Sequence, residues 1–340
     1  VEDVAFEVIE AGYEPMSCCD LGPKVNVVGN WLSDDVIAFN ALREVSDANN
    51  KQLQRAIVFD VRTRKSRVIV EEGSIQCWNP ERQIASINHA APTGERRLMR
   101  LDTEGNLGEP SGPPDLDDFF CRPINAEERL TGITGFQSDG LWFRDSDGYI
   151  PYIPPGKKRN RDTDKAVWVR PGKPPLALPI LRKEITGGRA IYLAYSGQYL
   201  LNEFDSQGSS DTDRRLAGRT WGDRPYDLTP YRLLSRDGSI AEFPYPYVLQ
   251  DYGIRSFDKL IPTRVGYLFG AVLDRHFSLF LLQEDRVIRF WGKPVRFKDG
   301  DSISGLTLSP DGCKIVFRRA RDWLPATRKH VTIINMCKGA

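Results

Sequence analysis

Histidine, serine and acidic side chains are the residues of this 340-residue chain that could do catalytic chemistry, and their spacing supports little of it. The chain has three histidines, His89, His276 and His330, too few for a histidine-rich metal centre. His89 follows an apolar run in INHAAP, where it could lie at a rim, although such a histidine is more often structural than a catalytic base. The Gly-x-Ser-x-Gly motif of α/β-hydrolase serine enzymes does not occur.

Acidic motifs give no stronger signal for a metal or a glycan site. The stretch DSDGYI (145–150) begins like a calcium loop, but an EF-hand needs a glutamate at its twelfth position, and Gly156 stands there. An ordinary turn is therefore expected at 145–150, and we expect neither a metal nor another cofactor. The Asp-box of sialidases is also missing, and SDGLW (138–142) resembles it only loosely.

Cations and aromatic side chains gather in three polar stretches, which indicates binding rather than catalysis. The stretch 156–165 holds the basic run KKRNR, which could contact an acidic partner or form a solvated loop. The segments 219–232 and 243–252, which overlap the stretches 205–230 and 245–260, carry tryptophan and tyrosine, residues favoured in binding hot spots. Their aromatics could equally pin long loops to the fold. The expected binding residues are Lys158, Arg159, Arg219, Trp221, Arg224, Tyr226, Tyr231, Tyr245, Tyr247 and Tyr252.

The charge balance narrows the class of partner. The chain has 47 basic and 46 acidic residues, a net charge of +1. A nucleic acid or a membrane surface would favour a basic excess, so another protein is the expected partner. No stretch approaches the roughly 18 consecutive apolar residues of a membrane span. We expect a monomer without a membrane-spanning segment.

Short β-strands joined by polar turns are the elements that must position these stretches. ISGLTLSPDGCKIVFRR (303–319) consists of an apolar run, a Pro-Asp-Gly turn and a second apolar run. The strands are rich in Val, Ile, Phe, Tyr and Trp, which suit a pleated surface, and sustained helical periodicity is missing. Similar units occur at 30–40, 77–88, 135–145, 193–204 and 271–282, with turns near residues 33, 79, 138, 196, 274 and 309.

Second hairpins follow at 55–70 and 96–110, and a further strand at 330–337. Two consecutive hairpins make a four-stranded antiparallel sheet, which is the unit of a β-propeller blade. The stretch LTLSPDGCKIVF (306–317) resembles the WD40-like repeat of TolB-type β-propellers. The matching residues are Ser309, Pro310, Asp311 and Gly312 in the turn, then Lys314, Ile315, Val316 and Phe317. The resemblance implies a propeller; such repeats occur in binding modules and beside peptidase domains, so it implies no particular activity.

The expected fold is all-β, a single β-propeller domain over residues 1–340 with about six four-stranded blades. Five or seven blades also fit, because 245–300 can be divided in more than one way. The stretches 156–165, 205–230 and 245–260 are then loop inserts. The last unit supplies only about three strands, and the alternating stretch 3–12 can supply the fourth. Pairing the N-terminal and C-terminal strands would close the ring and protect its edges.

Six cysteines, an even number, are compatible with disulfides in an exported protein. We expect Cys313 or Cys337 to pair with Cys18 or Cys19 and so to lock the closure. The first residue is Val1 rather than Met, which fits removal of a signal peptide as well as trimming of the chain. A periplasmic or secreted location is the expectation.

These features together predict a non-catalytic, protein-binding or scaffold β-propeller of an exported compartment. An inhibitor or immunity-type partner of a toxin or enzyme is one concrete version. The alternative is a glycan-active hydrolase or lyase with acids and arginines at the axial mouth. Two carboxylates about 5–10 Å apart in an axial pocket would favour that alternative.

Overall fold

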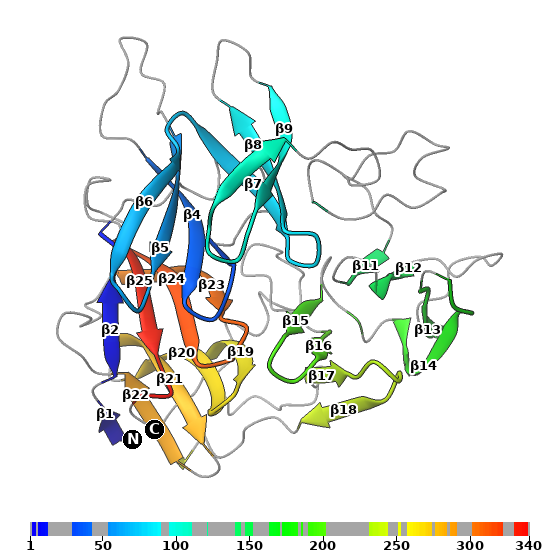
Figure 1. Cartoon of the computed structure of the whole chain (residues 1–340). Coiled ribbons are helices and arrows are strands. Elements are labelled where there is room, and N and C mark those ends of the chain that lie inside the picture. Colours follow the sequence, from blue (N-terminus) through cyan, green and yellow to red (C-terminus); the bar gives the residue numbers. More distant parts are fainter. Residues whose placement is uncertain are drawn as a thin grey trace. The chain divides into compact units, whose positions relative to one another are not determined.

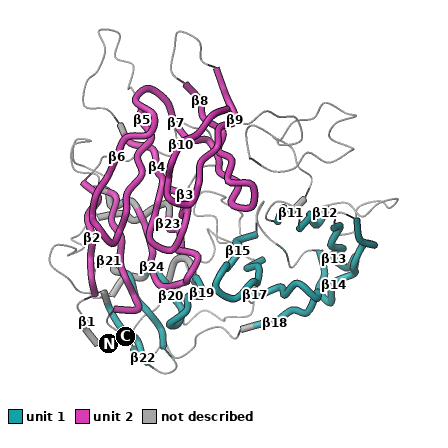
Figure 2. The backbone as a smooth tube through the Cα atoms, in the orientation of Figure 1, with its two compact units in different colours: residues 1–4, 136–291 teal, residues 5–135, 292–340 magenta. Residues whose placement is uncertain are grey.

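The described residues of the chain form twenty-five β-strands in a computed structural model (Figure 1). They fall into two compact units: unit 1 comprises residues 1–4 and 136–291, and unit 2 comprises residues 5–135 and 292–340 (Figure 2). The structure describes residues 2–4, 6–12, 29–42, 54–89, 95–110, 121, 140–143, 147–151, 163–170, 172–182, 185, 190–201, 231–243, 251–252, 257–273, 276–283, 286–290, 301–321 and 330–338.

Unit 2 contains three four-stranded antiparallel sheets. The first is β3 (Gly29–Trp31), β4 (Val36–Leu42), β5 (Gln54–Asp60) and β6 (Lys65–Val70), in that order. The second is β7 (Gly73–Asn79), β8 (Ile84–His89), β9 (Arg96–Leu101) and β10 (Leu107–Pro110). The third is β23 (Asp301–Leu308), β24 (Lys314–Arg321) and β25 (His330–Asn335), and β2 (Glu7–Glu10) completes it. This antiparallel pairing of β2 with β25 confirms that the N-terminal stretch supplies the missing strand.

Unit 1 has two larger sheets and two hairpins. The first of these sheets consists of β15 (Ile191–Leu193), β16 (Gln198–Leu200), β17 (Tyr231–Leu234) and β18 (Ile240–Phe243). The second contains β19 (Phe257–Thr263), β20 (Gly266–Leu273), β21 (His276–Gln283) and β22 (Arg286–Phe290). A fifth strand, β1 (Glu2–Val4), pairs parallel with β22. The hairpins are β11 (Gly140–Trp142) with β12 (Tyr149–Pro151), and β13 (Lys165–Trp168) with β14 (Leu176–Leu181).

The fold class matches the expectation: the chain is all-β in a β-propeller arrangement, and five of its sheets have four or more strands. A bridge between Tyr149 and Val169 joins the two hairpins of unit 1. Each of these residues donates its backbone N–H to the carbonyl of the other, at 2.9 and 2.8 Å. The strands β11 to β14 form two separate two-stranded sheets, so the described residues contain five blades, one fewer than the six expected and one of the alternatives that the sequence left open.

The predicted turns near residues 33, 79, 196 and 309 each join the first two strands of a sheet, as expected. The turn near 274 joins β20 to β21 instead, because the first turn of that sheet lies at Arg264–Val265 and lacks Pro and Asp. The strand β11 begins at Gly140 and pairs forward with β12, so its hairpin turn follows Trp142 rather than lying near 138.

Apolar side chains from neighbouring sheets form the cores. In unit 2, β4 and β5 contribute to one cluster with β2, β24 and β25, and their opposite faces contribute to a second cluster with β7, β8 and β9. Asn40 reinforces the second contact: its side chain donates to the carbonyl of Ile75 at 2.7 Å and accepts from the amide of Ile75 at 2.8 Å. In unit 1, Phe143, Trp168 and Tyr199 pack ring against ring.

Two disulfides are present in the described part of the chain, Cys77–Cys121 and Cys313–Cys337. The predicted pairing of Cys313 or Cys337 with Cys18 or Cys19 is therefore wrong. The ladder between β24 and β25 sets Lys314 opposite Asn335, and the amide of Met336 donates to the carbonyl of Cys313 at 2.8 Å. This register places the two cysteines side by side. Cys18 and Cys19 lie outside the described residues.

Candidate functional site

The three predicted inserts leave from the same end of the sheets in unit 1. In a meander of antiparallel strands, the first and third connections lie at one end, and the second connection and the exit to the next sheet lie at the other. Residues 152–164 join β12 to β13 and residues 201–230 join β16 to β17, both as second connections. Residues 244–256 run from β18 to β19 as an exit. We call the strand termini that bear these connections the insert-bearing end.

The opposite end of the same sheets carries short turns. Four residues, 194–197, separate β15 from β16, and five residues, 235–239, separate β17 from β18. Both turns are closed by local backbone hydrogen bonds: Gly197 donates to Leu193 at 2.8 Å, and Ser235 donates to Ser239 at 2.9 Å. The contrast in length shows that the longer connections of the sheet β15–β18 lie at one end only.

Two of the predicted binding residues lie in the described part of the chain. Tyr231 begins β17 in register with Phe243, so its backbone lies at the insert-bearing end. Tyr252 is partly exposed in the segment 251–252, within the connection between β18 and β19. Because Phe257 begins β19, the last four residues of the stretch 245–260 lie in a strand. The other predicted residues, Lys158, Arg159, Arg219, Trp221, Arg224, Tyr226, Tyr245 and Tyr247, lie outside the described residues.

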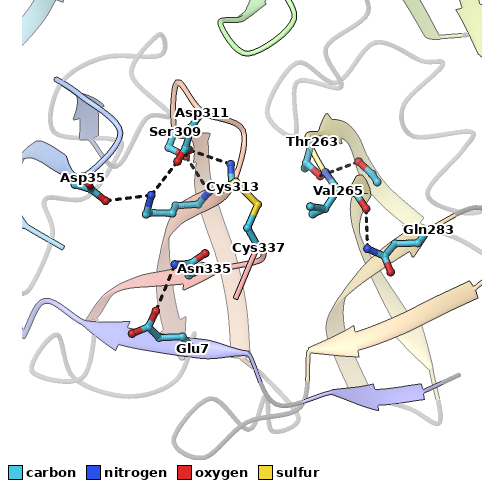
Figure 3. Close-up of a disulfide and its surroundings, with 12 residues drawn as sticks. Glu7, Asp35, Thr263, Val265, Gln283, Ser309, Asp311, Cys313, Asn335 and Cys337 are labelled. Atoms are coloured by element: carbon cyan, nitrogen blue, oxygen red, sulfur yellow. Dashed lines mark hydrogen bonds and ion pairs between the residues drawn. A yellow bond between two sulfur atoms is a disulfide. The ribbon is translucent and has the colours of Figure 1, made fainter. Parts of the chain in front are cut away.

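The TolB-like turn holds a cluster of charges that the sequence did not mark as a site (Figure 3). The Lys314 ammonium lies 3.1 Å from Asp35 Oδ1 and 3.0 Å from Asp311 Oδ2. Ser309 Oγ donates to Asp311 and accepts from the amide of Lys314 at 2.8 Å. The amide of Cys313 donates to Asp311 Oδ1 at 3.0 Å. One lysine thus ties the turn between β23 and β24 to the turn between β3 and β4.

The charge states of this cluster argue against acid–base chemistry. Burial alone would raise the pKa of Asp311, but hydrogen bonds from Ser309, Cys313 and Lys314, together with the lysine charge, lower it. Burial alone would lower the pKa of Lys314, and its bonds to Asp311 and Asp35 raise it instead. A glycosidase needs one carboxyl group whose pKa is raised, so that it can donate a proton at neutral pH. Asp311 is shifted in the opposite direction, so this pair of carboxylates fastens two sheets together.

A second charged cluster holds the N-terminal strand. Glu7 of β2 lies 3.1 Å from both Arg64 Nη2 and Lys338 Nζ, and accepts from Asn335 Nδ2 at 3.3 Å. Burial would raise the pKa of Glu7, but the hydrogen bonds and charges of Lys338 and Arg64 lower it. Glu10, three residues along β2, accepts from the buried hydroxyl of Thr332 at 3.0 and 3.1 Å. The acids of β2 therefore serve to fasten the strand.

Among the described residues, no carboxylate pairs exclusively with His89. It ends β8, and its backbone amide donates to the carbonyl of Glu95 at 3.0 Å. The carboxylate of Glu95 is bound by Arg97 at 2.6 Å, and this hydrogen bond is the largest cause that lowers the pKa of Glu95. In a catalytic triad the histidine ring is oriented by a buried acid, whereas the side chain of Glu95 is 49% exposed. The structural role expected for His89 fits this arrangement.

Metal and membrane signals do not appear in the described ranges. No three His, Cys, Asp or Glu side chains there are grouped so as to hold a metal ion. Of the stretch 145–150, Asp147 and Gly148 close the connection between β11 and β12, with Phe143 donating its amide to Gly148 at 3.1 Å. Across the same ranges, no helix combines the length and the apolar character needed to cross a membrane.

Comparisons with known proteins show similarity in fold only. No family model and no curated protein matches the sequence. Similar solved structures include the β-propeller domain of the Trilobed protease from Pyrococcus furiosus, with 10% identity, a TM-score of 0.43, and coverage of 85% of this chain and 88% of that one. The tricorn protease has 12% identity and a TM-score of 0.36, with 87% and 25% covered. TolB from Acinetobacter baumannii has 9% identity and a TM-score of 0.34, with 90% and 64% covered. Values of this size carry no information about activity.

Proposed function

We propose that this chain is a non-catalytic binding protein of an exported compartment, and that the insert-bearing end of unit 1 grips another protein. The observation that carries the proposal is the common attachment of all three inserts at one end of their sheets. These inserts hold the basic run 157–161 and the aromatic stretches 219–232 and 243–252. Rigid sheets that present variable loops at one end are a frequent design of binding proteins.

The location rests on the two disulfides. Cys77–Cys121 and Cys313–Cys337 both have Cα–Cα distances in the usual range, at 5.6 and 5.2 Å. Disulfides persist in oxidising compartments and are rare in the cytosol, so the periplasm or the extracellular space is the proposed location. A toxin or an enzyme is the partner that we would test first, which would make the chain an inhibitor or an immunity-type protein.

Affinity capture followed by charge reversal tests this proposal. A partner captured from the native source is purified, and its Kd is measured against the parent chain and against a variant that carries Lys158→Glu, Arg219→Glu and Arg224→Glu. We expect at least tenfold weaker binding, since buried charge pairs at interfaces contribute mainly by slowing dissociation. The matched control reverses Lys173 and Arg236, two exposed cations at the short-turn end of the unit 1 strands.

The control decides between specific and general electrostatic attraction. If both variants lose affinity equally, or if neither does, the insert-bearing end is not the binding face. Circular dichroism and thermal unfolding of each variant establish that the fold is kept. The glycan-active alternative is tested by assaying the same preparation on polysaccharides. Polysaccharide cleavage that co-purifies with the chain would support a hydrolase or lyase and contradict the binding proposal.

A further inference from the structure

The disulfide between Cys313 and Cys337 closes one end of the third sheet of unit 2 (Figure 3). Cys313 directly precedes β24, and Cys337 lies two residues beyond the end of β25. The last backbone hydrogen bond between these two segments runs from the amide of Met336 to the carbonyl of Cys313, at 2.8 Å. Among the described residues, the chain beyond Met336 is held to the sheet by this disulfide and by the ion pair of Lys338 with Glu7.

The N-terminal strand β2 depends on the end of β25 that this disulfide holds. In the described sheet β2 is the outermost strand, and β25 is the strand on which it lies. The register sets Glu7 opposite Asn335, the last residue of β25, and Asn335 Nδ2 donates to Glu7 at 3.3 Å. Lys338 adds an ion pair with Glu7 at 3.1 Å, but its side chain is 67% exposed, and exposed pairs contribute little to stability. The covalent bond is therefore the strongest constraint at this end of the sheet.

The two disulfides differ in how well they are protected from a reductant. Cys313 and Cys337 are both partly exposed. Cys121 is 0% exposed, and its carbonyl accepts a buried hydrogen bond from Asn79 Nδ2 at 2.9 Å, although its partner Cys77 is partly exposed. The rate of thiol–disulfide exchange depends on access of the attacking thiolate to a sulfur atom. A dithiol should therefore reduce Cys313–Cys337 first.

We propose that Cys313–Cys337 is a redox latch on β2, which opens when a dithiol reduces it and closes when the two cysteines are oxidised. A thiolate of the dithiol forms a bond to one cysteine sulfur, the bond between Cys313 and Cys337 breaks, and the other cysteine leaves as a thiolate. The second thiol of the reductant then displaces the first cysteine and completes the reductant's own disulfide. Two electrons and two protons thus pass to the protein, which ends with two thiols.

Reduction loosens β25, and β2 through it. The two cysteines are 24 residues apart in the sequence, and the segment between them contains β24 and β25. Loss of a cross-link returns conformational freedom to the segment that it closed. The strand β2 is held on β25 by four register pairs, so it opens when β25 does. The latch is separate from the insert-bearing end and does not depend on the binding proposal.

The biological sense of the latch rests on the proposed exported location. A reducing cytosol keeps thiols reduced, so the latch would stay open there, and an oxidising compartment would close it. The strand β2 would then become fully fastened only after export.

Graded reduction of the purified full chain with dithiothreitol tests the latch. The thiols released at each step are blocked with iodoacetamide and located by peptide mapping. We expect Cys313–Cys337 to be reduced about tenfold faster than Cys77–Cys121, because both of its cysteines are partly exposed. Equal rates, or earlier reduction of Cys77–Cys121, would overturn the proposal.

Hydrogen exchange of the same samples shows which strands the latch holds. After reduction of Cys313–Cys337 alone, exchange should be about tenfold faster at residues 7–10 and 330–335, because local opening governs exchange. Exchange should stay unchanged at residues 36–42, which form β4 in another sheet. Reoxidation should restore the slow exchange. Unchanged exchange at residues 7–10 would contradict the latch, and faster exchange at 36–42 as well would indicate global unfolding, also against the proposal.

Serine variants separate the effect of the disulfide from that of the reductant. The double variant Cys313→Ser, Cys337→Ser should show the fast exchange at residues 7–10 without any reductant. The double variant Cys77→Ser, Cys121→Ser is the matched control, and its exchange at residues 7–10 should equal that of the parent. Equal acceleration in both variants would mean a general loss of stability and would refute the latch. All these measurements use the purified chain, so failure of the proposed exported location would leave their outcome unchanged.

Discussion

The ammonium of Lys314 lies 3.1 Å from a carboxylate oxygen of Asp35, and this contact joins the last hairpin of the chain to its first four-stranded sheet. The same ammonium also holds Asp311, in the turn that resembles the TolB-type repeat. The lysine side chain is only 10% exposed. In this chain the turn at 309–314 thus places a largely buried cation between two turns.

Replacement of Lys314 by methionine should destabilise the fold by about 2 kcal/mol, because it leaves two partly buried carboxylates without their cation. Lys338→Met is the matched control: its ion pair with Glu7 has the same 3.1 Å distance, but its side chain is 67% exposed. Exposed pairs contribute about 0–1 kcal/mol. Urea unfolding of both variants measures the difference. If both variants lose the same free energy of unfolding, burial does not determine how much these ion pairs contribute to stability.

The stability of the fold should fall in acid partly through Asp311. Because its folded-state pKa lies below the ordinary value of 3.8, the contribution of Asp311 is fully present above that pH and is lost as pH falls through the lower folded value. The free energy of unfolding, measured at pH 7 and pH 3, should therefore differ less for Asp311→Asn than for the parent. If the difference between pH 7 and pH 3 is the same in Asp311→Asn and the parent, Asp311 does not contribute to the loss of stability in acid.

Peptide mapping under non-reducing conditions should recover the linked peptides Cys77–Cys121 and Cys313–Cys337. They close loops with sequence separations of 44 and 24 residues. Loss of either one should destabilise the protein by about 3–4 kcal/mol on chain-entropy grounds. Serine replacement of each pair, followed by thermal unfolding, checks the magnitude. Recovery of a peptide that links Cys337 to Cys18 or Cys19 would refute the pairing.

Gly148→Ala should break the bridge between the two hairpins of unit 1. A Cβ at this position would lie 1.9 Å from the carbonyl oxygen of Val169, and the φ angle of +95° disfavours any side chain. Gly197→Ala is the control, because its φ is +68° but the space around it is open. The free energy of unfolding of the control should fall by about 1 kcal/mol, as expected for a residue in the left-handed region. That of Gly148→Ala should fall several times as much. Thermal unfolding of the two variants compares them.

The sequence allowed the hairpins with turns near residues 33, 79, 196 and 309 to be found, because these turns contain Pro, Asp or Gly. It failed where such residues were lacking: the turn at Arg264–Val265 has none, so the hairpin boundary was assigned one turn late in that sheet. The disulfide between Cys313 and Cys337 depends on the register of β24 and β25, which alternation alone does not specify. The single strand expected over 3–12 is in fact two, β1 and β2, which lie in different sheets, and the three residues of β1 are too few to show a period of their own.

The insert-bearing end was predictable only in part. Composition picks out the three inserts, but their common end follows from the order of strands, which requires the pairing of β12, β16 and β18 with their neighbours. The ion pairs of Lys314 with Asp35 and Asp311 could not be predicted as one cluster, because Asp35 is far from the other two residues in the sequence. The Ser-Asp pair at 33–34 and the Ser-Pro-Asp turn at 309–311 were recognised as equivalent turns, and that equivalence was the available signal.

The pairing of Glu7 with Asn335, 328 residues apart, has a consequence for how the protein is made. A ribosome synthesises β2 long before its partner β25, because 328 residues separate Glu7 from Asn335. Throughout that interval the strand β2 lacks the partner with which it forms its ladder. The third sheet of unit 2 can therefore be completed only after synthesis has passed residue 335.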